Sequence, residues 1–151
     1  MKHAVIHIRL ATLDDAGFLL RLRNDPETRL NSHNTDPVEE AGHVVWLERN
    51  LKDPQVKIYI AALEGRPVGT VRVTAESTWK HFSWTVAPEC RGQGYGHEMV
   101  NTVAGCTDGL LRAEVKVGNV SSQKIATKAG FILEHEKDGV RYYVLTTRSK
   151  A

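Results

Sequence analysis

Three glycines at alternate positions, directly after an arginine, form the segment of this chain best suited to chemistry. They stand in the run Arg91-Gly92-Gln93-Gly94-Tyr95-Gly96. A strand pattern over residues 79–86 leads into the run, and an amphipathic helix pattern begins within it. Glycine lets the main chain curl and expose successive N–H groups, and the free N–H groups at a helix N-terminus bind anions. The run therefore predicts a site for a phosphate-bearing ligand.

Two well-known phosphate-binding loops do not fit this run. A Walker loop needs Gly-Lys followed by Ser or Thr, whereas His97 follows Gly96 here. A dinucleotide fingerprint needs a wider spacing of its glycines and a second strand that ends in an acidic residue, and the sequence has neither. A glycine-rich turn that binds nothing is a further alternative. Three glycines and Arg91 at a junction of strand and helix disfavour it.

The run resembles the Arg/Gln-x-x-Gly-x-Gly/Ala loop that binds the acyl-CoA pyrophosphate in the GNAT family of N-acetyltransferases. A second block, Glu114 to Asn119 with Ser122 and then Lys128-Ala129-Gly130-Phe131, is similar to another conserved region of that family. The stretch Arg23-Asn24-Asp25-Pro26-Glu27 resembles the ribosomal-protein and amino-sugar branches. The resemblance implies an enzyme that transfers an acetyl group from acetyl-CoA to an amine and releases CoA.

The same resemblance implies which residues hold the donor. Main-chain N–H groups of the glycine run would bind the pyrophosphate, and the end of the preceding strand would pair with pantetheine like an added strand. A bulge before Pro88 is expected to separate two strands and free the groups that this pairing needs. The implied cofactor-binding residues are Thr85, Val86, Arg91, Gly92, Gln93, Gly94, Tyr95, Gly96, Asn119, Ser122 and Lys128.

The catalytic base has two candidates. Glu114 lies on the polar side of its predicted strand, and it matches the proposed base of the branch that acetylates N-terminal alanine. A solvated carboxylate with no catalytic role is the alternative for Glu114. His81 is the second candidate, because imidazole titrates near neutral pH. Many relatives carry a glutamate on the strand before the loop, but Lys80 occupies that position here.

The catalytic acid is where the sequence departs from the family pattern. Many relatives have a tyrosine two residues before the lysine of the Lys-x-Gly-Phe motif, and that position is Ala126 here. Ser122 resembles a serine with this role in one ribosomal-protein branch, although a serine in a first helical turn also satisfies main-chain groups. Water is a further proton source. Tyr142 and Tyr143 are predicted to face opposite sides of a strand, one of them in the core.

The resemblance implies that the loop between the first two predicted helices forms one wall of the acceptor site. It is rich in hydrogen-bonding side chains, and Asn31, Ser32 and His33 are the candidate acceptor-binding residues. The loop favours a small polar amine such as an amino sugar or a nucleotide amino sugar. A protein N-terminus is the alternative acceptor. A non-catalytic acyl-CoA sensor, and a structural module without a ligand, are the alternatives of other classes.

Composition restricts the remaining possibilities. The chain has 151 residues, a net charge of +2 and 41% hydrophobic residues, which predicts one globular domain over residues 1–151. Basic residues are scattered, so nucleic acid is not an expected partner. No stretch is long and apolar enough for a membrane span or a signal peptide, and the two cysteines do not form a disulfide framework. We expect a cytoplasmic protein without a metal, and a homodimer is left open.

Hydrophobic periodicity and turn residues place these motifs on elements. The predicted order is β-α-α-β-β-β-α-β-α-β-β, an α/β fold with a mixed, mostly antiparallel sheet flanked by helices, as in the GNAT family. Helices are predicted over 13–24, from Asp36 to about residue 53, over 95–106 and over 120–129, and residues 29–35 are predicted to form a loop. Asp138-Gly139 predicts the turn of a final hairpin.

Overall fold

The structure is a computed structural model, and it describes residues 5–147. Seven strands and five α-helices alternate along the chain in nearly the predicted order. In chain order the elements are β1 (Ile6–Leu10), α1 (Ala16–Asn24), α2 (Pro26–Leu30), α3 (Glu40–Lys52), β2 (Val56–Leu63), β3 (Arg66–Ala75), β4 (Lys80–Val86), α4 (Tyr95–Gly105), β5 (Gly109–Lys116), α5 (Val120–Lys128), β6 (Ile132–Lys137) and β7 (Val140–Thr147).

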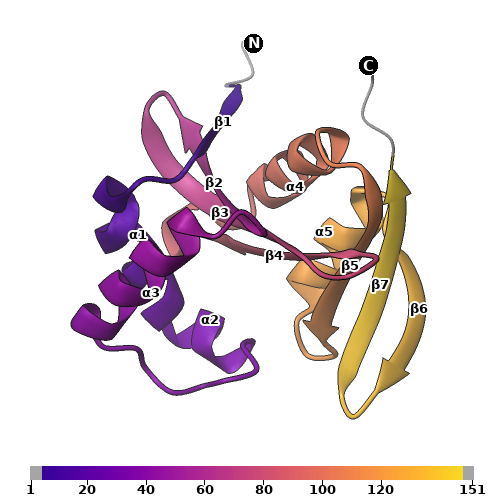
Figure 1. The fold of residues 1–151 in the computed structure, drawn as a ribbon. Coiled ribbons are helices and arrows are strands. Elements are labelled where there is room, and N and C mark those ends of the chain that lie inside the picture. Colours follow the sequence, from indigo (N-terminus) through magenta and orange to yellow (C-terminus); the bar gives the residue numbers. More distant parts are fainter. Residues whose placement is uncertain (1–4, 148–151) are drawn as a thin grey trace.

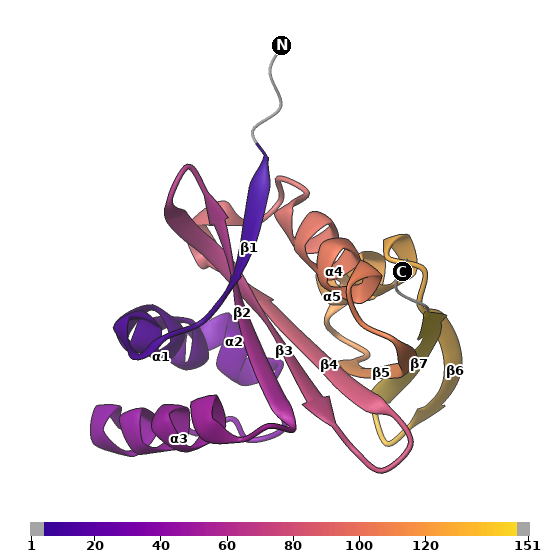
Figure 2. The same cartoon turned by 45° about the horizontal axis from the view of Figure 1, so that its top comes forward.

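The strands form one sheet in the order β1-β2-β3-β4-β5-β7-β6. Every neighbouring pair is antiparallel except β4 and β5, which are parallel. Helices α1, α2 and α3 cover one face of the sheet, and α4 and α5 cover the other (Figures 1 and 2). The predicted mixed α/β fold is therefore confirmed, and the two faces offer separate surfaces for two ligands.

The larger core lies between the sheet and the pair α4 and α5. Alternation along β3 explains it, because Val71 and Val73 are buried on this side while Arg72 and Thr74 point to the other face. Phe82 of β4 and Tyr143 of β7 also belong to this core. A smaller core under α1 and α3 contains these buried residues: Ala11, Leu19, Leu47, Ile58 and Ile60.

The parallel pairing of β4 with β5 is short. It runs from Lys80 opposite Leu111 to Phe82 opposite Ala113, and no later residues of the two strands pair. The strand β4 continues to Val86 in regular register with β3. The predicted bulge before Pro88 is therefore absent from β4, and the strands separate because their pairing ends rather than because an extra residue is inserted.

The segment between α1 and α3 differs from the prediction. Residues 26–30 form the short helix α2, because Pro26 occupies the first helical turn and the Asp25 carboxylate accepts the N–H of Thr28 at 3.1 Å. Helix α3 begins at Glu40 rather than just after Asp36. The reason is that the side chain of Asn24 binds both main-chain groups of Val38 at 2.7 Å and holds that residue extended.

The other predicted turns agree with the structure. Gly130 has a φ of 97°, as expected of a glycine after the end of a helix. Asp138 and Gly139 have φ values of 51° and 79°, the two positive angles of a tight hairpin turn.

Gly69 provides a test of the packing at the end of β4. A Cβ at this position would lie 2.8 Å from the carbonyl oxygen of Thr85, a main-chain atom held by the sheet. We expect Gly69→Ala to lower the free energy of unfolding by about 1–3 kcal/mol, as measured by urea denaturation. Gly42→Ala is the matched control, because it lies within α3 with open space around it and should raise stability by about 0.5–1 kcal/mol. Equal effects of the two substitutions would contradict this packing.

Candidate active site

The glycine run forms a curled loop that ends in the N-terminus of α4. Gly92 and Gly94 have φ values of 78° and 86°, which side-chain-bearing residues rarely adopt. Gly94 is the residue that caps α4, and it supplies no side-chain hydrogen bond to the first turn. The N–H groups of the first turn therefore remain available for an anion. The anion site at this loop therefore stays a prediction, and the loop has the curl and the helix N-terminus that such a site needs.

Gly96 allows three elements to meet behind this loop. A Cβ on Gly96 would lie 2.4 Å from Cδ1 of Ile125 on α5 and 3.2 Å from Cγ2 of Val86 on β4. A larger residue would move α4 away from both neighbours. The missing side chain thus keeps the anion site close to the end of β4.

Beyond Phe82, β4 has a free edge on the side of β5. The N–H of Ala87 donates to Val68 of the β3 segment at 2.8 Å, so alternation turns the main-chain groups of Trp84 and Val86 away from β3. The indole Nε1 of Trp84 is also buried, and no residue within 5–147 accepts its hydrogen. These groups fit a ligand that adds to β4 as a strand would. The main-chain N–H and carbonyl groups of Thr85 point toward β3 instead.

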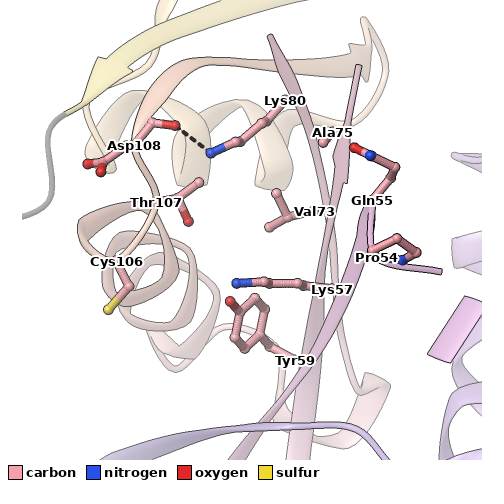
Figure 3. A pocket seen from close by; sticks show the side chains of 10 residues that line it. All are labelled: Pro54, Gln55, Lys57, Tyr59, Val73, Ala75, Lys80, Cys106, Thr107 and Asp108. Carbon is pink, nitrogen blue, oxygen red and sulfur yellow. Dashed lines mark hydrogen bonds between the residues drawn. The ribbon is translucent and has the colours of Figure 1, made fainter. Parts of the chain in front are cut away.

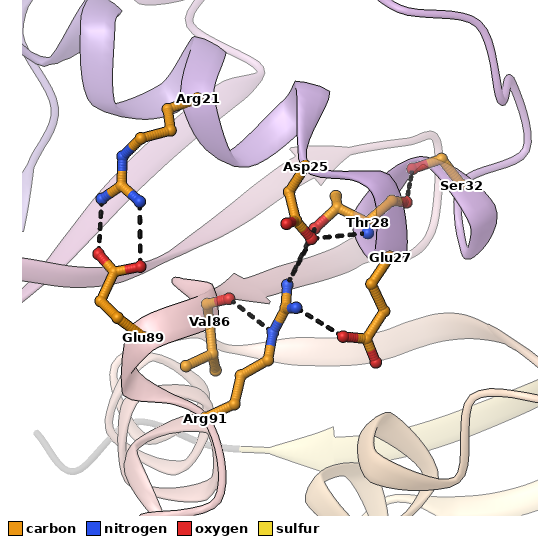
Figure 4. A network of polar contacts seen from close by, with 8 residues as sticks. All are labelled: Arg21, Asp25, Glu27, Thr28, Ser32, Val86, Glu89 and Arg91. Carbon is orange, nitrogen blue, oxygen red and sulfur yellow. Dashed lines mark hydrogen bonds and ion pairs between the residues drawn. The ribbon is translucent and has the colours of Figure 1, made fainter.

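Arg91 does not point at the free N–H groups of the loop (Figure 4). Its guanidinium binds Glu27 at 2.7 Å and Asp25 at 3.1 Å, and its Nε donates to the carbonyl oxygen of Val86 at 3.1 Å. These contacts join the start of α2 to the loop and to the end of β4. Arg91 therefore positions the anion site, and its acid partners are the two carboxylates of the Arg23 to Glu27 stretch.

A second ion pair attaches α1 to the same region. Both guanidinium nitrogens Nη1 and Nη2 of Arg21 bind the carboxylate of Glu89, at 3.0 and 2.8 Å, just before the loop. The loop is thus held against the helices of the opposite sheet face at two points.

Glu114 and His81 come together where β4 and β5 separate. Nε2 of His81 lies 3.5 Å from Oε2 of Glu114, and Nε2 of His33 lies 3.4 Å from Oε1 of the same carboxylate. The Glu114 side chain is 29% exposed, so it is open to a ligand from the side of α2. The structure therefore brings both predicted bases and one predicted acceptor-binding residue to one point.

The environment of His81 favours its neutral form. Burial lowers the pKa of His81 below its ordinary value, and the charge of Arg72 lowers it further, while the nearby Glu114 carboxylate opposes the change. A neutral imidazole at neutral pH can accept a proton or pass one on.

The remaining predicted residues belong to α5 and its start, and within residues 5–147 no hydrogen bond or ion pair joins them to Glu114 or His81. The Asn119 side chain accepts the N–H of Ser122 at 3.2 Å and so caps α5. Lys128 is exposed in the last turn of α5. Ala126 is fully buried in the main core, so the position of the expected tyrosine is a packing position in this chain.

The predicted acceptor wall is partly fixed by its own contacts. The hydroxyl of Ser32 donates to the carbonyl oxygen of Thr28 at 2.6 Å, and Asn31 ends α2. Lys116 of β5 donates to the carbonyl oxygen of Leu30 at 3.1 Å and so ties this wall to the sheet. Of the three predicted residues in this wall, His33 alone contacts Glu114.

Sequence reasoning did not single out Arg23 and Arg72 as site residues. Both lie on the face covered by α1, α2 and α3. The available signal was the arginine within the alternating pattern of β3, on the side opposite Val71 and Val73.

A separate hollow lies elsewhere on the molecule (Figure 3). It measures about 320 Å³ and is found at the start of β4 and past the end of α4, near Lys80 and Cys106. The glycine loop joins the opposite ends of these two elements, so this hollow is not the anion site. Within residues 5–147 there is no cluster of three or more side chains that could hold a metal, and no helix long and apolar enough to cross a membrane.

The pKa of His81 can be measured directly. NMR titration of its imidazole signals should give a pKa below 6.5, and Glu114→Gln should lower it further by removing the carboxylate charge. Because the folded state then binds this proton less readily than the unfolded chain, the His81 contribution should destabilise the fold as pH falls through 6.5. A pKa above 6.5 in the unmodified protein would contradict the assigned environment.

Comparison with known proteins agrees with this geometry. The family profile for the acetyltransferase (GNAT) domain matches residues 6–132. The comparison with curated proteins gave no match. Among solved structures, a spermidine N-acetyltransferase from Vibrio cholerae with CoA and spermine has a TM-score of 0.81 at 16% identity, over 93% of this chain and 94% of that one.

Two further solved structures are similar in fold. A domain from Methanocaldococcus jannaschii has a TM-score of 0.83 at 18% identity and covers 96% of this chain and 100% of its own. The aminoglycoside acetyltransferase AAC(6')-Ib, solved with ribostamycin and coenzyme A, has a TM-score of 0.79 at 19% identity, with coverages of 95% and 93%. With the family profile covering most of its length, the chain belongs to the GNAT acetyltransferase family.

Proposed function

We propose that this protein transfers the acetyl group of acetyl-CoA to the primary amine of a small polar acceptor. The observation that carries the proposal is the separation of β4 and β5 between the glycine loop and the Glu114–His81 pair. A donor entering from the side of α4 and an acceptor entering from the side of α2 would meet at this opening.

The described residues fit the donor by the chemistry of their free groups. The first turn of α4 offers N–H groups to the pyrophosphate, and Gly92 and Gly94 give the loop its curl. Trp84 offers its main-chain groups to the pantetheine amides, and the N–H of Val86 remains for the thioester, because the Val86 carbonyl oxygen accepts from Arg91. Arg91 acts indirectly, by holding the loop against α2.

Transfer requires removal of one proton from the acceptor. The amine nitrogen attacks the thioester carbon, a C–N bond forms, and the C–S bond breaks as CoA leaves as a thiolate. Glu114 takes the proton of the attacking amine, with neutral His81 beside it as the second proton acceptor. The N–H of Val86 is placed to stabilise negative charge on the carbonyl oxygen. The thiolate takes its proton from water or from Ser122, because Ala126 has no acidic group.

The polar loop beside the opening supports a polar acceptor. His33 contacts Glu114, and Asn31 and Ser32 precede it in the same loop, which favours an amino sugar or a nucleotide amino sugar. The solved relatives were crystallised with spermine or an aminoglycoside, which are also amines. A protein N-terminus is the alternative acceptor, so a short peptide belongs in any acceptor screen. The paired base candidates support an enzyme over a non-catalytic sensor.

Glu114→Gln is the sharpest kinetic test. Loss of the proton acceptor should lower kcat by about a hundredfold, measured as CoA thiol release with a screened amine acceptor. The CoA dissociation constant should stay unchanged, because Glu114 faces the acceptor side. In the unmodified enzyme kcat/KM should rise with pH through the lowered pKa of His81, and His81→Gln should remove that dependence.

Glu48→Gln is the matched control, since this carboxylate is exposed on α3 and should leave the rate unaltered. Full activity of Glu114→Gln would refute the assigned base. Tight CoA binding without release of thiol for any amine, sugar or peptide would instead support a sensor.

A further inference from the structure

Among the arginines on the acceptor side of the sheet, Arg72 of β3 and Arg23 of α1 have no acidic partner within residues 5–147. Removing a guanidinium from water without a counter-charge is costly, and proteins generally pair such groups. Guanidinium groups without an ion pair near an active site therefore indicate a negatively charged ligand.

Arg72 lies beside the point where β4 and β5 separate. It is in register with Ser83, the residue after the last β4–β5 pair at Phe82. Its guanidinium carbon stands 5.5 Å from the ring centroid of Trp46 on α3, and the Trp46 ring stacks on His43 at 5.4 Å. The stacking holds the guanidinium on this face, and no residue of the described part of the chain accepts a hydrogen bond from its N–H groups.

Arg23 approaches the same place from α1. Its Nη2 donates to the carbonyl oxygen of Asn34 at 2.8 Å, whereas its Nη1 is buried and has no hydrogen-bond acceptor among the described residues. Burial lowers the pKa of Arg72 and of His43, and the positive charge of Arg23 lowers both further. Arg23 is therefore close enough to Arg72 for their charges to repel each other.

The carboxylates nearest to this region interact with histidines rather than with these arginines. Glu114 contacts His81 and His33, and the exposed Glu76 acts electrostatically on His81. The region around Arg23 and Arg72 thus carries excess positive charge next to the predicted transfer point.

We propose that Arg23 and Arg72 bind a phosphate group on the acceptor, so that the substrate of this enzyme is a phosphate-bearing amine. The inference rests on the proposed function for the position of the acceptor. Two neighbouring guanidinium groups match a dianion better than a single carboxylate, because each can donate N–H groups to its oxygens. The same charges disfavour polycations such as the spermine of the similar Vibrio cholerae structure.

Inorganic phosphate tests this site without any acetyl transfer. The protein is first saturated with CoA, so that the pyrophosphate site of the glycine loop is filled, and phosphate is then titrated in. The NMR signal of the Trp46 indole N–H, which stacks on Arg72, should shift to saturation. Acetate should bind at least about tenfold more weakly than phosphate.

Arg72→Gln and Arg23→Gln should each weaken phosphate binding by about tenfold or more. Arg49→Gln, which removes an exposed arginine of α3, is the matched control and should leave phosphate binding unchanged. Arg23 is half-buried at the end of α1, outside the sheet, so its variant keeps the test available if Arg72→Gln fails to fold. A shift that does not saturate, phosphate binding in both variants as tight as in the unmodified protein, or acetate binding as tightly as phosphate would overturn the proposal.

A kinetic comparison separates this proposal from the proposed function. Glucosamine 6-phosphate should be acetylated with a higher kcat/KM than glucosamine, and the preference should vanish in Arg72→Gln. Equal kcat/KM values for the two amines would overturn the phosphate site. Acetylation of no amine would contradict the proposed function, while the phosphate titration would still decide the anion site.

Discussion

The short parallel pairing of β4 with β5 is the constraint on which the rest of the structure depends. Pairing stops after Phe82, so each strand keeps polar main-chain groups that the other does not satisfy. A buried strand edge of this kind is costly unless something pairs with it. The glycine loop directly follows the free part of β4, and the catalytic candidates flank it. One break in pairing therefore creates both the donor slot and the meeting point with the acceptor.

The arginines on the two sides of the opening between β4 and β5 differ in their ion pairing. On the donor side the arginines are already paired, because Arg91 and Arg21 bind carboxylates and leave the anion to main-chain N–H groups. On the acceptor side Arg23 and Arg72 form no ion pair with a described carboxylate. The loop is thus positioned by ion pairs with α1 and α2, the same helices that wall the acceptor site. Helices α1 and α2 therefore hold both the donor site and the acceptor site in place.

Local signals allowed the sequence to predict much of the fold and the loop. Each of these signals depends on a few neighbouring residues, so it can be recognised in the sequence. They are the glycines of the run, the hairpin turn at Asp138-Gly139 and the alternation of buried and exposed residues in β3. The partners of Arg91 could not be read, because Asp25 and Glu27 stand more than sixty positions earlier in the chain. Helix α2 was missed because the proline that ends one helix also begins the next. Burial of His81 likewise depends on distant elements.

Amide hydrogen exchange tests the central claim most directly. Addition of acetyl-CoA should slow exchange of the Trp84 and Val86 amides, which face the gap, and of the amides of residues 93–96, which form the anion site. The amides of residues 132–137 on the far edge strand should be unaffected, because β6 lies away from the gap. Protection confined to the hollow near Lys80 and Cys106, with no change at Trp84 or Val86, would contradict a donor site between β4 and β5.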